Sequence, residues 1–170
     1  MENPPLDLSS ALALLGDAVS AEVVRALRGT GLRHSHGYIV QRLLVAPRTA
    51  TQLAEELGVS QQAVSKMVRE LTARGLVEIV ADTGDRRRRP VQLTTAGWQA
   101  VERARSARRA IDDRIRRALG ADRFDETLAA LGVALEALGL AAGVRRRAVP
   151  PPSGWPGEEP RSPGSVGGAG

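Results

Sequence analysis

The chain has 170 residues, with 24 basic against 19 acidic side chains for a net charge of +5, and it contains no cysteine and two histidines. Disulfides, thiolate metal sites and thiol redox sensing are therefore excluded, and we expect no bound metal or cofactor. No apolar run approaches the about 20 residues that cross a bilayer, and the amino terminus lacks a signal-peptide pattern. We therefore expect a cytoplasmic protein with no membrane partner. An excess of basic side chains suits a polyanionic partner, but the base composition of a genome can also raise arginine content. The positions of the arginines, and not their number, must therefore decide between these two explanations.

The first predicted element is a long amphipathic helix. Apolar residues recur at spacings of three and four from Leu8 to Leu27. Asp7 or Ser9 can cap its start, and Gly29 follows its end. Because this helix is long for a small domain, we expect its apolar stripe to pair with something besides its own core.

Three further helices are predicted in the next forty or so residues, of which the last two form a helix-turn-helix. The first runs from Ser35 to Ala46, and Pro47 stops it. Thr49 and Gln52 then have the spacing of a capping box at the start of the second. At the turn that follows stands Gly58, a residue that adopts positive φ at little cost.

The last helix of this pair has an apolar side and a polar side. Ser60 can cap its start, and Val64, Met67 and Leu71 lie along one face. Amide, hydroxyl and cationic groups at the start of a helix can read base edges and phosphates in a major groove. The alternative is an ordinary solvated helix face. The candidate DNA-binding residues of this recognition helix are Ser60, Gln61, Gln62, Ala63, Ser65, Lys66 and Arg69.

A β-hairpin is predicted directly after the recognition helix, as in a wing. Its strands are residues 77–80 and 91–93, with turn residues between them. Four consecutive arginines, Arg86, Arg87, Arg88 and Arg89, precede the second strand and repel one another unless something negative neutralises them. We interpret them as DNA-binding residues, one of which enters a minor groove. Asp85 is placed to pair with one arginine and support the wing; the alternative is a solvated basic loop.

Two long helices and a tail complete the chain. Thr94 caps a helix that continues to Leu119, Gly120 ends it, and Asp122 caps a last helix with leucines at spacings of three and four. With the first helix, these expose more apolar surface than a small DNA-binding module uses, so we expect a homodimer; packing within one chain is the alternative. Beyond Gly143 the chain is rich in proline and glycine, and we expect it to be disordered.

The sequence therefore predicts a mainly α fold with a small β-hairpin wing, a winged helix-turn-helix domain plus long terminal dimerisation helices. The predicted units are an amino-terminal dimerisation helix in 1–33, the DNA-binding domain in 34–95, carboxy-terminal dimerisation helices in 96–143 and a disordered tail in 144–170. There is no G-x-S-x-G, H-E-x-x-H or phosphate-binding glycine loop, so we do not expect an enzyme.

The segments GVSQQAVSKMVRELTARGLVE and DRRRRPVQLTTAG, in this order of elements, resemble the MarR family of winged-helix transcriptional regulators. The resemblance covers roughly residues 8–143, and its wing signature falls on Asp85, Arg87, Val91, Leu93, Thr94 and Gly97. It implies a homodimeric repressor or activator that binds a pseudo-palindrome in double-stranded DNA. Arg87 would be the minor-groove arginine, and the helix that starts at Gln61 would read bases.

The resemblance also implies a small-molecule effector, because many members release DNA when a compound binds between the dimerisation helices and the DNA-binding lobe. The candidate ligand-binding residues are His34, His36, Tyr38 and Trp98. The alternative is that these are helix-start and packing residues. Without cysteine, the mechanism of the peroxide-sensing branch does not apply. The alternative function is a sequence-tolerant architectural DNA-binding protein without an effector.

Overall fold

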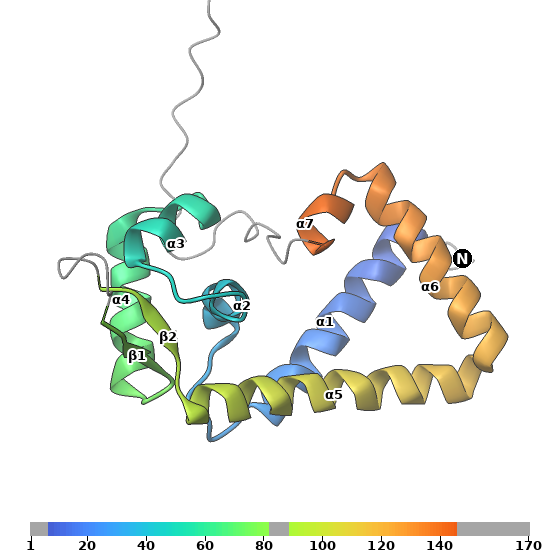
Figure 1. Cartoon of the computed structure of the whole chain (residues 1–170). Helices are drawn as coiled ribbons and strands as arrows, with labels where there is room; N and C mark the ends of the chain where they lie inside the picture. The colour runs from blue at the N-terminus through green and yellow to red at the C-terminus, as the bar shows by residue number, and fades with distance from the viewer. Residues whose placement is uncertain (1–6, 82–88, 146–170) are drawn as a thin grey trace, which may run out of the picture.

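The computed structural model describes residues 7–81 and 89–145. Figure 1 shows a lobe of short helices and a hairpin at one end of a long helix, and further helices toward its other end. The elements are α1 (Leu8–Ala26), η1 (His34–His36), α2 (Gly37–Leu43), α3 (Ala50–Leu57), α4 (Gln61–Ala73), β1 (Val77–Ile79), β2 (Val91–Leu93), α5 (Thr95–Leu119), α6 (Ala121–Ala137) and α7 (Ala141–Arg145). The predicted fold class, mainly α with a small β-hairpin, is confirmed.

The hydrophobic core lies in the lobe formed by α2, α3, α4, the hairpin and the start of α5. Its largest fully buried apolar side chains are Ile39, Leu53, Val64, Leu71 and Val77. The end of α1 also belongs to this core through Val23 and Leu27, so the first helix joins the lobe instead of standing apart from it.

The hairpin is a two-stranded antiparallel sheet that packs one face on the core. Val77 pairs with Leu93 and Ile79 pairs with Val91. Arg48 extends this sheet by a bridge to Val91, with Arg48 N–H to Val91 O at 3.1 Å and Val91 N–H to Arg48 O at 2.8 Å. The segment that enters α3 is thereby tied to the base of the hairpin.

Several helix starts follow from local capping chemistry. Asp7 caps α1 and accepts a hydrogen bond from Ser10 N–H at 2.8 Å, and Thr94 caps α5 by accepting from Gly97 N–H at 3.1 Å.

The prediction that Asp122 caps α6 is wrong. The chain reverses at Gly120, which has φ 82° and directly precedes the helix, so Asp122 falls inside the first turn.

The second predicted helix is shorter than expected. A 3₁₀ turn, η1, occupies residues 34–36, and α2 ends at Leu43 instead of Ala46. Pro47 disfavours helical geometry in the residue before it, which explains why the chain leaves the helix early. Residues 44–46 form a turn instead.

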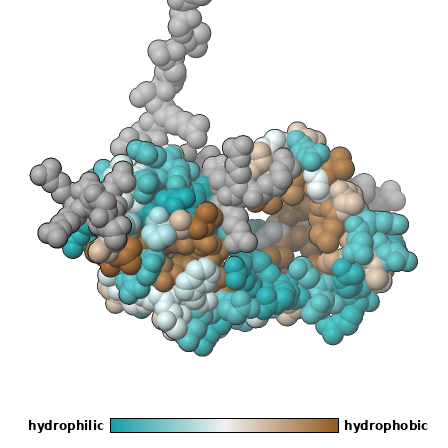
Figure 2. Space-filling view, in the orientation of Figure 1, coloured by the Kyte–Doolittle hydropathy of each residue, from teal (hydrophilic) through white to brown (hydrophobic). Residues whose placement is uncertain are grey.

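The long helix α5 connects the lobe to α1 and α6, which pack against it. The apolar stripe predicted for α1 is buried only at its end, because Leu8 and Leu15 remain exposed. Leu128 and Leu138 of α6 are likewise exposed, and Figure 2 shows hydrophobic residues over the second half of α6. Among the described residues, no helix is long and apolar enough to cross a membrane.

Candidate nucleic-acid interface

The helix α4 separates buried apolar side chains from exposed polar ones. Val64, Met67 and Leu71 are buried in the core. The residues predicted to bind DNA lie away from that core: Gln61, Gln62, Lys66 and Arg69 are exposed, and Ser60, Ala63 and Ser65 are half-buried. The fold therefore gathers a polar and cationic face on the first three turns of one helix.

The start of α4 is fixed by its cap and by the turn before it. Ser60 Oγ accepts a hydrogen bond from Ala63 N–H at 3.3 Å. Gly58 has φ 67°, a left-handed conformation that glycine adopts without steric cost, and it ends α3. Ala54 is buried, and its small side chain allows α3 and α4 to pack closely. These two helices and their turn form the predicted helix-turn-helix.

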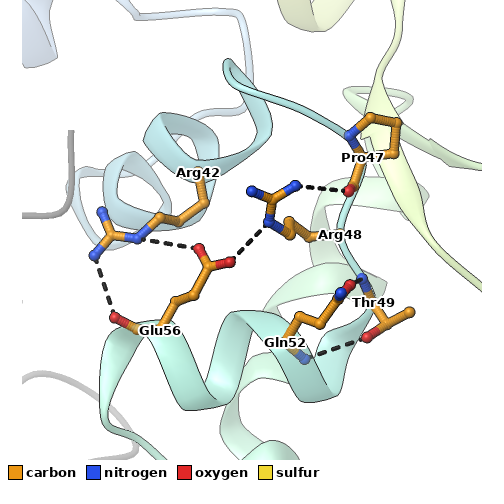
Figure 3. A network of polar contacts seen from close by, with 6 residues as sticks. All are labelled: Arg42, Pro47, Arg48, Thr49, Gln52 and Glu56. Atoms are coloured by element: carbon orange, nitrogen blue, oxygen red, sulfur yellow. Dashed lines mark hydrogen bonds and ion pairs between the residues drawn. The ribbon is translucent and has the colours of Figure 1, made fainter. Parts of the chain in front are cut away.

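The start of α3 carries the predicted capping box. Thr49 N–H donates to Gln52 Oε1 at 2.9 Å, and Gln52 N–H donates to Thr49 Oγ1 at 3.2 Å (Figure 3). Both bonds satisfy amide groups that would otherwise lack a partner at a helix start.

A buried arginine joins α2 to α3 (Figure 3). Arg42 is 4% exposed, its Nε lies 3.5 Å from Glu56 Oε2, and its Nη2 donates to the Glu56 carbonyl oxygen at 3.3 Å. Burial lowers the pKa of Arg42, and the Glu56 carboxylate opposes that shift. Glu56 also accepts from Arg48 Nε at 2.7 Å. The carboxylate thus holds α3 to the preceding helix and to the bridge residue of the hairpin.

Sequence analysis missed this network. Its only local signal is a single arginine inside the apolar segment YIVQRLLV, where an arginine on the buried face requires a partner.

Only one of the predicted wing residues, Arg89, lies within the part of the chain that the structure describes. Arg89 is exposed and lies two residues before β2. Val80 N–H donates to Pro90 O at 2.9 Å, which continues the strand pairing toward the wing. Asp85, Arg86, Arg87 and Arg88 lie outside the described residues.

A second polar cluster lies behind α4, on the side of η1 and α2. His36 is 1% exposed, its Nδ1 accepts from Arg33 N–H at 3.2 Å, and its Nε2 lies 3.5 Å from Glu70 Oε2. Arg33 Nη1 lies 3.5 Å from the same Glu70 oxygen, and Arg74 donates to the Gly31 carbonyl oxygen. Burial lowers the pKa of His36, while Glu70 opposes the shift. This cluster connects the recognition helix to the segment that precedes α2.

A cavity of about 520 Å³ lies between α1, α2 and α5. Tyr38 is among the residues that line it, whereas His36 and Trp98 are not. Trp98 is exposed in the first turn of α5, and His34 belongs to η1. Of the candidate ligand residues whose side chains are described, His36, Tyr38 and Trp98, only Tyr38 lines the cavity.

Comparison with known proteins agrees with this geometry. Residues 30–88 match a model described as MarR family. The transcriptional regulator Tm0710 from Thermotoga maritima superposes with a TM-score of 0.62 at 23% identity, covering 77% of this chain and 93% of that one. The S. aureus MepR–DNA complex gives 0.63 at 21% identity, with 76% and 98% covered, and YusO from Bacillus subtilis gives 0.61 at 22%, with 78% and 93% covered. No curated protein matches.

The structural likeness extends over most of each of these chains, which establishes a shared fold, and the family match covers the segment that contains α2, the helix-turn-helix and β1. Proteins of the matched family are transcriptional regulators and not enzymes. The resemblance drawn from the recognition helix and the wing signature is thereby confirmed: residues 30–88 are similar to the MarR family, and the chain shares the fold of winged helix-turn-helix regulators.

Proposed function

We propose that this DNA-binding regulator acts as a homodimeric, sequence-specific repressor that a small-molecule effector releases from its operator. The observation that carries the proposal is the division of α4, whose apolar side is buried while its polar side is exposed from its first turn onward. Such a regulator must reach the chromosome, so the proposal places it in the cytoplasm.

The exposed face of α4 supports base reading in a major groove. Gln61 and Gln62 present amide groups in the first turn, which can form paired hydrogen bonds with adenine. Ser65 offers a hydroxyl group, and Lys66 and Arg69 offer charge to phosphates. The DNA-bound neighbour MepR has the same fold, which supports the same use of this helix.

The apolar surface of the terminal helices supports a homodimer. Leu14, Leu128, Val133 and Leu138 are 53–71% exposed in a single chain. Apolar surface of this kind on a helix favours association, and a two-fold axis buries the same patch on both copies. We propose that α1, α6 and the distal part of α5 form this interface and set two recognition helices about 34 Å apart, one DNA turn.

The wing supports a minor-groove contact by its sequence and by its anchored base. The Arg48–Val91 bridge holds β2 against the segment that enters α3. We propose that Arg87 enters the minor groove, that Asp85 orients it, and that Arg86, Arg88 and Arg89 contact phosphates. Arg89 is exposed at the base of the hairpin, as this requires.

The cavity supports the effector part of the proposal. It is lined by α1 and α5, which carry the proposed dimer interface, and by α2 of the DNA-binding lobe. A ligand that binds one arrangement of these helices better than another shifts the spacing of the recognition helices. Tyr38 is the candidate contact residue that lines it.

Selection of binding sites from random duplex DNA tests the proposal. Enrichment of a two-fold motif with half-sites one turn apart is expected. Binding without enrichment would favour a sequence-tolerant architectural protein instead. A protein that stays monomeric and does not bind duplex DNA at low salt would contradict both readings.

A further inference from the structure

A single carboxylate lies between the two parts of the chain that are proposed to contact DNA. Glu56 stands on α3, which packs against the recognition helix α4. Arg48 pairs with this carboxylate through its side chain and is bridged to Val91 of the hairpin through its backbone. One pair of side chains therefore joins the helix-turn-helix to the base of the wing.

A buried charge fixes the position of the Glu56 carboxylate. Arg42 is 4% exposed, and its Nε lies 3.5 Å from Glu56 Oε2. If the carboxylate turned into solvent, the buried guanidinium group would lose this counter-charge, which is costly. Arg42 Nη2 also donates to the Glu56 carbonyl oxygen at 3.3 Å, so α2 holds both the side chain and the backbone of Glu56. The carboxylate is thus a fixed point on α3.

Arg48 connects this fixed point to the hairpin (Figure 3). Its side chain is 24% exposed, its Nε donates to Glu56 Oε1 at 2.7 Å, and its Nη1 donates to the Pro47 carbonyl oxygen at 3.1 Å. Its backbone exchanges two hydrogen bonds with Val91, of 3.1 and 2.8 Å. The exposed Arg89 stands only two positions before Val91. The contacts therefore lead from the core of the lobe to the base of the wing.

We propose that Glu56 is a positioning residue for the wing, and that it acts through Arg48 to hold Arg89 at a fixed place relative to the exposed face of α4. This inference rests on the proposed function, in which Arg89 and Lys66 contact phosphates from the wing and from α4. Phosphate contacts fix the register of a protein on the duplex, so two such contacts must keep a spacing that the DNA can match. A hairpin that is already oriented also loses less conformational freedom on binding.

Hydrogen exchange in the full-length protein tests the positioning without DNA. Arg48→Met removes the guanidinium group but leaves the pair between Arg42 and Glu56 in place. The Val91 amide, which donates to the Arg48 carbonyl oxygen, should then exchange about 10-fold faster. The Val64 amide in α4 should change by less than about 2-fold. An unchanged Val91 amide, or equal acceleration of both amides, would overturn the positioning role.

Three further variants locate the effect at the carboxylate. Glu56→Gln should accelerate the Val91 amide as Arg48→Met does, whereas Glu55→Gln, on the same helix and exposed, should not. Arg25→Met breaks an exposed arginine–glutamate pair on α1 and should also leave that amide unchanged. If Glu56→Gln unfolds the lobe, Arg48→Met still decides the question. Acceleration by Glu55→Gln or Arg25→Met would contradict a specific role of the Glu56 carboxylate.

Affinity for the selected operator tests what the positioning does. Arg48→Met should weaken binding about 10-fold in the wild type, and by less than about 2-fold once Arg89→Ala has removed the wing contact. Combined with Lys66→Ala it should keep its full effect, because that contact lies on α4. Full effects in both backgrounds would mean general destabilisation and overturn the proposal. A chain that does not bind DNA would instead contradict the proposed function, and exchange of the Val91 amide would still show if Glu56 and Arg48 orient the hairpin.

Discussion

The Arg42 guanidinium is buried against Glu56, with Arg42 Nε 3.5 Å from Glu56 Oε2 and Arg42 Nη2 donating to the Glu56 carbonyl oxygen at 3.3 Å. A positive charge in the core of a small lobe is stable only while its partner remains. The partner carboxylate stands on α3, the helix that packs against α4, so the pair joins the folding of the lobe to the placement of the proposed DNA-binding face.

Removing the carboxylate should therefore destabilise the lobe. We expect Glu56→Ala to lower the free energy of unfolding by about 2 kcal/mol, because Arg42 keeps its carbonyl contact but loses its counter-charge. Glu55→Ala, on the same helix and exposed, should change it by less than about 0.5 kcal/mol. Urea denaturation measures both, and equal effects would mean that the carboxylate is not needed to hold Arg42.

Gly97 should not tolerate a side chain. A Cβ at this position would collide with the carbonyl oxygen of Leu76, a backbone atom, and would also press on Leu93. We expect Gly97→Ala to cost about 1–3 kcal/mol in thermal or chemical unfolding. In the matched variant Gly132→Ala the new Cβ meets nothing within 4 Å in the middle of α6, so stability should stay level or rise by up to about 1 kcal/mol. Unchanged stability of Gly97→Ala would contradict the close approach of α5 to the backbone of Leu76, the residue before β1.

Arg87→Ala tests the wing. If this arginine enters the minor groove, we expect operator binding to weaken by about 1–3 kcal/mol. Arg28→Ala removes an exposed charge from the turn after α1, outside the proposed DNA and dimer interfaces, and serves as the control. Fluorescence anisotropy with the selected operator measures both. Unchanged affinity together with unchanged sequence preference would remove Arg87 from the interface.

Gln62→Ala and Ser65→Ala test base reading by α4. We expect each to change the preferred base at one or two positions of the half-site more than it lowers binding to unrelated DNA. Lys66→Ala is the comparison, since loss of a phosphate contact weakens all sequences alike and reduces the salt dependence. Repeated selection with each variant provides the measurement. A uniform loss for Gln62→Ala would assign that side chain to phosphate.

His36 should make stability depend on pH. Burial lowers the pKa of His36 in the folded state, against the opposing effect of Glu70 and with Arg74 and Arg33 adding to the lowering. The unfolded chain therefore binds a proton that the folded chain does not, once the pH falls through about 6.5. We expect the full contribution above that pH and a progressive loss of stability below it.

Urea denaturation at pH 7.5, 6.5 and 5.5 measures this loss. The decrease in the free energy of unfolding between pH 7.5 and 5.5 should vanish in His36→Gln. It should persist in His34→Gln, which removes the other histidine. Asp7 and Glu102 have lowered pKa values through hydrogen bonds to Ser10 and Arg109, but such carboxylates lose their contribution only as the pH falls through about 4. A slope that survives in His36→Gln would assign the pH dependence to another group.

Local patterns in the sequence predicted the elements whose determinants lie within a few residues. Thr49 and Gln52 cap α3, Ser60 caps α4, and Gly58 turns between them, because each device needs only neighbours along the chain. Asp122 was wrong as a cap for a related reason. The competing signal of Gly120 stands two residues earlier and starts the helix at Ala121.

The polar clusters could not be predicted, because their partners meet only in the folded chain. Arg42 and Glu56 are 14 residues apart in sequence, and Glu70 reaches His36 and Arg33 from a different helix. The same limit applies to the candidate ligand residues. His36 lies at a helix start in the sequence, but folding turns its ring onto Glu70 and away from the cavity wall that Tyr38 lines.

The length of α5 has a mechanical consequence. Its 25 residues span about 37 Å, with one end beside the hairpin and the other beside α6. If α5 tilts by about 10° about its end beside α6, its end beside the hairpin moves by about 6 Å. That displacement exceeds the spacing of about 3.4 Å between successive base pairs along DNA. A slight shift among the leucines of α6 is thus amplified along α5 into a larger displacement at the end that lies beside the hairpin.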